Sequence, residues 1–207
     1  MSIRGFLQRV RVIPVLAVEN VRDAAPLAQA LYAGGLSVLE VTLRTAAALP
    51  VLESMRRALP DAVIGAGTLT RPEDFTSARA AGAQFAVSPG FTLALAQAAS
   101  AAGLPLLPGV MTPSEILAAM SAGYDTLKFF PAEPAGGTAS LSAFASVFPG
   151  IKFCPTGGIT AERAASYLAL PNVLCVGGSW VAPPALIARG DWSAIETLAR
   201  SAAAYQR

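Results

Sequence analysis

Several residue types that carry much of enzyme chemistry are rare or absent in this 207-residue chain. It has no histidine, two cysteines and, among its 15 basic residues, only two lysines. Without histidine or a CxxC pair, a zinc site has almost no ligands, so histidine-dependent hydrolases and metal-dependent aldolases are excluded. Cys154 and Cys175 each lie within an apolar run, which is typical of reduced, buried thiols and not of a disulfide framework.

Charge is also scarce. Charged residues make up 14% of the chain and hydrophobic residues 54%, so much of the chain is expected to be buried in a core or against other subunits. The net charge of +2 forms no basic stripe, which argues against a nucleic-acid partner. No apolar run reaches the roughly 18 residues of a membrane-spanning helix, and residues 1–10 lack the pattern of a secretory signal. We therefore expect no membrane association and a cytoplasmic location.

Short apolar runs alternate along the chain with longer stretches of helical period. The short runs predict strands at 11–18, 37–43, 62–68, 84–88, 105–110, 126–130, 151–155 and 173–177. The longer stretches predict helices near 23–33, 47–58, 72–81, 92–102, 113–122, 139–147, 160–168 and 191–204. Proline and acidic residues at 71–74 (RPED) and 112–115 (TPSE) are typical of helix starts.

The alternation amounts to eight units of roughly 26 residues, which is the length of a strand, a helix and two short loops. It predicts an α/β fold, a single (β/α)8 TIM barrel with short loops. A doubly wound open sheet is the alternative. No linker or composition shift marks a second domain, so residues 1–207 are expected to form one barrel domain. A short N-terminal segment, about 1–10, precedes the first strand.

The second predicted strand carries charges in an alternating pattern. Glu40, Thr42 and Arg44 alternate with apolar residues that fit a face packed under helices, so these three are expected to face the barrel axis. Glu40 and Arg44 lie roughly 13 Å apart along a strand, a spacing suited to gripping two parts of one ligand. The alternative is a pair of solvated rim charges, although an unpaired carboxylate in mid-strand is costly to bury.

The two lysines occupy different positions in their strands. Lys128 lies toward the end of the predicted strand 126–130, the end at which chemistry gathers in such barrels, whereas Lys152 opens the next strand. Burial in an apolar strand favours the neutral amine, which is the form that attacks a carbonyl carbon. Lys128 is therefore a candidate Schiff-base nucleophile. The alternative is that its side chain extends to the rim and meets a carboxylate there.

In the absence of histidine, proton transfer falls to a carboxylate, a tyrosine, a lysine or water. Glu40 is the acid that the pattern places inside. Asp125 and Glu133, which flank the strand of Lys128, are expected to be solvated. Tyr124 is expected to belong to a helix-to-strand turn.

Two glycine pairs close late strands, at 157–158 and at 177–178. Loops after the seventh and eighth strands are the usual phosphate position in these barrels, where exposed backbone N–H groups can hold the anion. One such pair would indicate a turn, but two at these positions favour a phosphate site. Small residues at 65–68 (GAGT) and 88–90 (SPG) complete the rim and leave room for a ligand.

Motifs along nearly the whole chain match those of one known family. They are LEVTLRT at 39–45, GAGT at 65–68, SPG at 88–90, LKFFPAE at 127–133, PTGGI at 155–159 and GGSW at 177–180. With these motifs the chain resembles the class I 2-keto-3-deoxy-6-phosphogluconate (KDPG) aldolase / 4-hydroxy-2-oxoglutarate aldolase family. The motifs around Glu40 and Lys128 are the most specific.

The resemblance implies a homotrimeric enzyme that cleaves KDPG to pyruvate and glyceraldehyde 3-phosphate with neither a metal nor a cofactor. Carried over by position, Lys128 would form the Schiff base and Glu40 would move the protons. Arg44 and Thr68 would hold the pyruvoyl carboxylate. Pro89 and Phe130 would shape the pocket. The distal hydroxyls and the phosphate would be received by Thr156, Gly157, Gly158, Gly178 and Ser179.

Other functions stay open at this point. The related galactonate aldolases lack the Leu-Arg-Thr and Phe-Phe-Pro-Ala-Glu motifs present here, which favours the gluconate substrate. Activity on the galactonate epimer or on 4-hydroxy-2-oxoglutarate remains an alternative. A phosphate-binding barrel isomerase or synthase would explain the glycine pairs but would give the buried Lys128 no role in the reaction. A non-catalytic sugar-phosphate-binding barrel is a third class.

Overall fold

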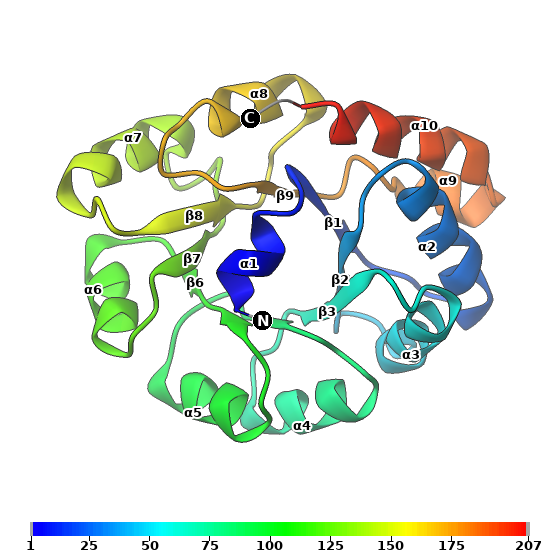
Figure 1. The fold of residues 1–207 in the computed structure, drawn as a ribbon, viewed down its shortest axis with the longest axis horizontal. Coiled ribbons are helices and arrows are strands. Elements are labelled where there is room, and N and C mark those ends of the chain that lie inside the picture. The colour runs from blue at the N-terminus through cyan, green and yellow to red at the C-terminus, as the bar shows by residue number, and fades with distance from the viewer. Residues whose placement is uncertain (1, 206–207) are drawn as a thin grey trace.

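The computed structural model describes residues 2–205, and its parallel strands form an inner layer surrounded by helices (Figure 1). The strands are β1 (Val12–Leu16), β2 (Val38–Thr42), β3 (Val63–Gly67), β4 (Ala86–Val87), β5 (Leu106–Leu107), β6 (Gly109–Val110), β7 (Thr126–Phe129), β8 (Lys152–Pro155) and β9 (Val176–Gly178). The helices are α1 (Ile3–Leu7), α2 (Ala24–Ala33), α3 (Ala48–Ala58), α4 (Pro72–Ala80), α5 (Leu93–Ala101), α6 (Pro113–Ser121), α7 (Gly137–Val147), α8 (Ala161–Leu168), α9 (Pro184–Arg189) and α10 (Trp192–Ala203), with a 3-10 helix η1 (Val21–Asp23).

The strands form two curled parallel sheets. One sheet has the order β5-β4-β3-β2-β1-β9, and the other has the order β6-β7-β8. Isolated bridges from Phe153 to Val173 and from Thr156 to Gly177 connect the strand β8 with the segment of β9. The predicted alternation of strands and helices in a parallel α/β fold is confirmed.

The fifth predicted strand, 105–110, is wrong as one continuous strand. It consists of β5 and β6, which are separated by Pro108. Proline has no N–H to donate to a strand ladder, so the pairing breaks at this residue. The Pro108 carbonyl still accepts a hydrogen bond of 2.8 Å from Lys128 N on β7. Pro108 is therefore the point at which the chain passes from the first sheet, which contains β5, to the second, which contains β6.

Two short helices have no counterpart among the sequence-based predictions. The helix α1 lies over the centre of the space enclosed by the curled sheets (Figure 1), and its Ile3, Phe6 and Leu7 join an inner core. The helix α9 follows β9 directly before α10. Neither helix is long enough to display a helical period in an apolar pattern, which is why the periodicity did not indicate them.

The core has two parts, one on each face of the strands. Outward-facing residues such as Leu39 and Val41 pack under the helices, whereas Val38 belongs to the inner core with α1. Because side chains alternate along a strand, Glu40 and Thr42 follow Val38 on the inner face, nearer the carboxyl end of β2. The fold thus fills the amino end of the interior with apolar side chains and leaves polar groups at the other end.

Helix starts follow the predicted signals. Thr112 and Glu115 form a reciprocal capping box at α6, and Asp74 accepts hydrogen bonds from the backbone of Thr70 and Arg71 at α4. These bonds satisfy N–H groups that have no partner within a helix. Within residues 2–205, no helix has the length and apolar character needed to cross a membrane.

Candidate active site

A lysine and a carboxylate meet on the inner side of the curled sheets. Lys128 Nζ, from β7, lies 3.5 Å from Glu40 Oε1, from β2, and the two residues are 5% and 3% exposed. The ammonium also lies 5.1 Å from the centroid of the Phe130 ring, within the range of a cation–π contact. Each buried charge therefore has a partner of opposite sign, which offsets part of the free energy lost when the charge leaves water. The inward orientation predicted for Glu40 and the burial predicted for Lys128 are both confirmed.

Glycine on the neighbouring strand makes room for Glu40. Gly67 pairs with Thr42 in the register of β2 and β3, and a Cβ at Gly67 would collide with the Glu40 carboxyl group. Any other residue at this position would push the carboxylate away from Lys128. Gly67 of the GAGT segment thus makes room for the Glu40 side chain, a packing role that the sequence analysis did not predict.

Arg44 lies beyond the end of β2 and is held by the strand itself. Its Nε donates to Thr42 Oγ1 at 3.1 Å, and that hydroxyl in turn donates to the Leu16 carbonyl at 2.7 Å. The hydrogen bonds fix one edge of the guanidinium group. Because a guanidinium has five donors in a planar fork, the terminal nitrogens keep the geometry needed for a carboxylate.

A cavity of about 130 Å³ lies at this end of the strands. Its walls include seven of the predicted residues, namely Arg44, Phe130, Thr156, Gly157, Gly158, Gly178 and Ser179. Phe130 connects the cavity to the buried pair, because its ring also contacts Lys128. Val15, Ile159 and Gly177 line the cavity as well and were not among the predicted site residues. Val15 could have been found from its position in β1 opposite Glu40.

Thr68 and Pro89 lie outside the walls of that cavity. Thr68 lines a separate cavity of about 380 Å³ together with Arg71 and Asp74. It has φ 63°, the one positive φ of a non-glycine residue within 2–205, and a β-branched side chain is strained in this region. The backbone of Pro89 packs closely on Gly109, and a Cβ on Gly109 would collide with the Pro89 carbonyl group. The structure therefore places these two residues beside, and not in, the cavity of Arg44.

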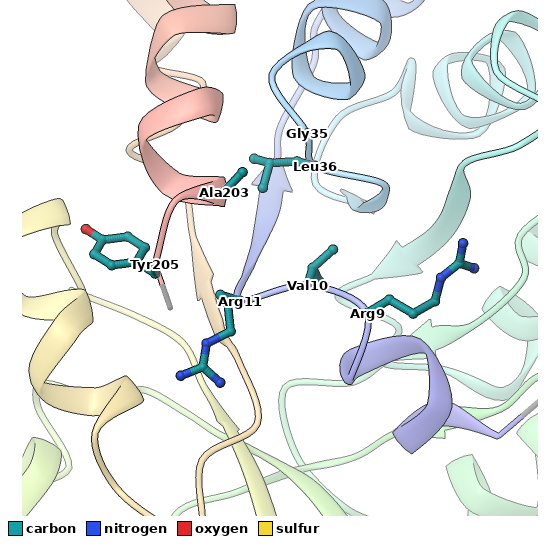
Figure 2. Close-up of a pocket in the computed structure, with 7 residues that line it drawn as sticks. All are labelled: Arg9, Val10, Arg11, Gly35, Leu36, Ala203 and Tyr205. Atoms are coloured by element: carbon teal, nitrogen blue, oxygen red, sulfur yellow. The ribbon is translucent and has the colours of Figure 1, made fainter. Parts of the chain in front are cut away.

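A further cavity of about 250 Å³ lies near the amino ends of the strands, lined by Arg9, Val10, Arg11, Gly35, Leu36, Ala203 and Tyr205. The side chains of Arg9 and Arg11 extend in opposite directions (Figure 2). Arg11 donates to the carbonyls of Leu168 and Leu174, each at 3.1 Å. The two cations do not converge on one ligand position, so this end lacks the arrangement seen around Lys128.

The acidic residues that flank β7 differ in their surroundings. The Asp125 side chain is 60% exposed and forms an ion pair with Arg4, as expected for a solvated residue. The expectation for Glu133 is wrong, because its side chain is only 23% exposed and is bound by Arg163 and by the Tyr167 hydroxyl, 2.7 Å away. The signal that was missed is the spacing of Arg163 and Tyr167, which places both on one face of α8.

Three other residues agree with expectation. Tyr124 precedes β7 and packs edge-on against Phe91, and burial raises the pKa of its hydroxyl. Cys154 and Cys175 are free and buried. The hydrogen bond with Cys154, together with burial, raises the pKa of the Cys175 thiol well above its ordinary value, so this thiol stays protonated at neutral pH.

The model of a known family, described as KDPG and KHG aldolase, matches residues 3–198. The chain belongs to the KDPG and KHG aldolase family. The 2-dehydro-3-deoxy-phosphogluconate aldolase of Pseudoalteromonas atlantica is 49% identical over 193 residues, 93% of this chain and 90% of that protein. The KHG/KDPG aldolase of Escherichia coli K12 is 46% identical over 201 residues, 97% of this chain and 94% of that protein.

A solved structure of the same family has the same fold. The crystal structure of KDPG aldolase from Legionella pneumophila is 47% identical and superposes with a TM-score of 0.95 over 97% of this chain and 98% of that chain. That protein was captured with pyruvate as a covalent carbinolamine intermediate at low pH. The family resemblance inferred from the motifs is confirmed.

Proposed function

We propose that this chain is a Schiff-base-forming aldolase, a carbon–carbon lyase that reversibly cleaves KDPG to pyruvate and glyceraldehyde 3-phosphate. The observation that carries the proposal is the buried pair of Lys128 and Glu40, 3.5 Å apart, in contact through Phe130 with a cavity closed by glycine loops. Neither an isomerase nor a passive sugar-phosphate binder needs an amine that bonds covalently to a carbonyl carbon, whereas a Schiff-base aldolase does. The names of the Pseudoalteromonas and Escherichia relatives support the same activity.

In the proposed reaction, Lys128 Nζ gives a proton to Glu40, and the neutral amine attacks the C2 carbonyl of the substrate and forms a carbinolamine. Loss of water gives a protonated imine. Removal of the proton from the C4 hydroxyl then breaks the C3–C4 bond, glyceraldehyde 3-phosphate leaves, and the electron pair remains as an enamine. Protonation at C3 and hydrolysis release pyruvate and restore the amine. Glu40 is the group placed to exchange these protons, because its carboxylate lies at the nitrogen that bears the imine.

The other predicted site residues receive roles in the same proposal. Arg44 holds the pyruvoyl carboxylate, with Thr68 as a second contact from the adjacent cavity. Pro89 and Phe130 shape the pocket. The phosphate and the distal hydroxyls bind where Thr156, Gly157, Gly158, Gly178 and Ser179 line the cavity. No metal and no cofactor takes part in any of these steps.

We also propose that the two curled sheets close into one (β/α)8 barrel, with β5 and β6 acting as a single strand interrupted at Pro108. The two bridges between the segments of β8 and β9 support closure on the other side. In this proposal residues 1–207 form one domain, of which Met1, Gln206 and Arg207 lie outside the described residues. A homotrimer remains part of the proposal on the strength of the family resemblance alone, and a cytoplasmic location remains the expectation drawn from the sequence.

The substrate is tested by comparing the cleavage rates of KDPG, its galactonate epimer and 4-hydroxy-2-oxoglutarate under the same conditions. We expect the highest kcat/KM for KDPG, because the glycine loops suit a phosphate that the hydroxy-oxoglutarate does not have. Activity on 4-hydroxy-2-oxoglutarate is the second candidate, favoured by the relative from Escherichia coli. A higher kcat/KM for the galactonate epimer would overturn the assignment of the substrate.

A further inference from the structure

The loop that closes the phosphate end of the cavity lies against the segment that follows β7. Gly157 and Gly158 have φ of 105° and 78°, and a Cβ on Gly158 would lie 2.8 Å from Glu133 Cβ. The two segments are also joined by their backbones, since Ala132 N donates to Thr156 O at 2.8 Å and Glu133 N to Gly157 O at 3.0 Å. Any movement of residues 131–133 would therefore move the glycine loop.

The side chain of Glu133 ties this segment to the next helix. Its Oε2 accepts from the Arg163 guanidinium and its Oε1 accepts from the Tyr167 hydroxyl at 2.7 Å. Both donors lie on α8, one turn apart, and α8 begins directly after the glycine loop. The Glu133 carboxylate thus connects the segment after β7, which is hydrogen-bonded to the glycine loop, with α8, which follows that loop.

Tyr167 is well suited to hold such a contact. Its side chain is fully buried, and burial together with the hydrogen bond to Glu133 raises the pKa of the hydroxyl, so the proton stays available for donation. Arg163 supplies a charge that offsets the carboxylate.

We propose that Glu133 is a positioning residue for the phosphate end of the substrate, acting through Arg163, Tyr167 and the backbone of Gly157 and Gly158. It does not touch the reacting atoms. Its carboxylate fixes the glycine loop in the left-handed conformation that lines the cavity, and so it sets the preference for a phosphorylated aldehyde. The inference rests on the proposed function and names a determinant of its substrate class.

The test uses the synthesis direction, with pyruvate and either glyceraldehyde 3-phosphate or unphosphorylated glyceraldehyde. The measured quantity is the ratio of kcat/KM for the two aldehydes, and trapping of the pyruvate imine with borohydride is a separate readout. For Glu133→Gln we expect this ratio to fall roughly tenfold, through a higher KM for the phosphorylated aldehyde, because small misplacements of binding groups have large effects. The rate of imine trapping should stay close to that of the wild type.

Asp125→Asn is the matched control, because Asp125 also flanks β7 and also forms an ion pair, but it lies at the opposite end of the strand. It should change neither quantity. Tyr167→Phe keeps the ring and removes one donor to Glu133, so a fall of about threefold in the ratio is expected. This milder variant decides the question if Glu133→Gln does not fold.

An unchanged ratio in Glu133→Gln, or an equal loss with both aldehydes, would overturn the inference, and so would an unchanged ratio in Tyr167→Phe. A wild type that does not prefer the phosphorylated aldehyde would also overturn it, because there would be no phosphate site to position. The proposed function fails by a different result, namely the absence of a trapped pyruvate imine in the wild type.

Discussion

The chain's two lysines lie on neighbouring strands, and their surroundings differ in almost every respect. Lys128 on β7 pairs in register with Cys154, two residues beyond Lys152 on β8. Lys128 points into the interior and meets Glu40 and Phe130, whereas Lys152 is only partly buried and its Nζ donates to the Pro171 carbonyl at 2.9 Å. One amine is buried beside a carboxylate and a cavity, and the other is solvated at the start of its strand.

The difference shows what position along a strand decides in this fold. At the amino ends the interior is filled by α1 and apolar side chains, and the arginines of the nearby cavity point apart (Figure 2). At the carboxyl ends, loops with glycine leave space around charged groups that are already paired. A lysine becomes a candidate nucleophile through these surroundings and not through its residue type.

Replacement of each lysine by arginine tests the comparison, and the largest loss of activity is expected for Lys128. Lys128→Arg keeps a cation beside Glu40 but cannot form an imine, so we expect cleavage of KDPG to fall by on the order of 10⁴-fold or more. Lys152→Arg should leave kcat/KM within about twofold, because the side chain is only partly buried and does not line the cavity. Steady-state kinetics with a check of the fold by circular dichroism measures both. Equal losses in the two variants would contradict the comparison.

Glu40→Gln should separate binding from turnover. The amide keeps the shape of the side chain but cannot exchange protons, so we expect kcat to fall roughly 10²-fold or more while pyruvate still forms an imine. Single-turnover trapping and steady-state rates supply the two measurements. Glu53→Gln, on the exposed face of α3, is the control. Near-normal turnover in Glu40→Gln would make Glu40 a structural residue only.

Arg44→Ala and Arg71→Ala test which of two adjacent cavities holds the carboxylate of pyruvate. Arg44 lines the cavity that contacts Phe130, and Arg71 lines the one that contains Thr68. We expect Arg44→Ala to raise the pyruvate concentration needed for half-maximal imine trapping by roughly tenfold, the cost of a lost bond to a charged group. Arg71→Ala should have little effect. The reverse order would place the carboxylate next to Thr68.

The smallest effect is expected at Glu115, which caps α6 away from the cavity. Burial raises the pKa of Glu115, but hydrogen bonds from Met111 and Thr112 outweigh it and hold the pKa below its ordinary value. The ionised carboxylate therefore adds stability above the pKa of the unfolded chain, and this stability is lost as the pH falls through the folded pKa. Glu115→Gln should lower the free energy of unfolding at pH 7 by about 0.5 to 1 kcal/mol, since the group is exposed.

Urea unfolding at pH 7 and at pH 3 measures this contribution. The difference between Glu115→Gln and the wild type should shrink at pH 3, while kcat/KM at pH 7 stays unchanged. A difference that is equal at both pH values would mean that the charge of Glu115 contributes nothing to the cap.

The sequence predicts the parallel α/β fold, the inward position of Glu40 and the burial of Lys128, because all three follow from apolar patterns, whereas the 3.5 Å contact between the two side chains is a finding of the structure. Alternation with period two separates the inner from the outer face of β2, and the apolar run around Lys128 marks a buried strand. The helix α1 escapes prediction because it is too short to display a helical period, and the break at Pro108 escapes it because β5 pairs with β4 whereas β6 pairs with β7. Glu133 escapes it for a similar reason, since its partners Arg163 and Tyr167 lie about 30 residues further along the chain.

The central claim is that Lys128, and not Lys152, forms a covalent imine with pyruvate. Wild-type protein treated with pyruvate and borohydride, then digested and analysed by mass spectrometry, tests it directly. We predict one reduced pyruvate adduct per chain, on Lys128, and none in Lys128→Arg under the same conditions. A folded wild-type protein without an adduct, or with its adduct on Lys152, would contradict the account.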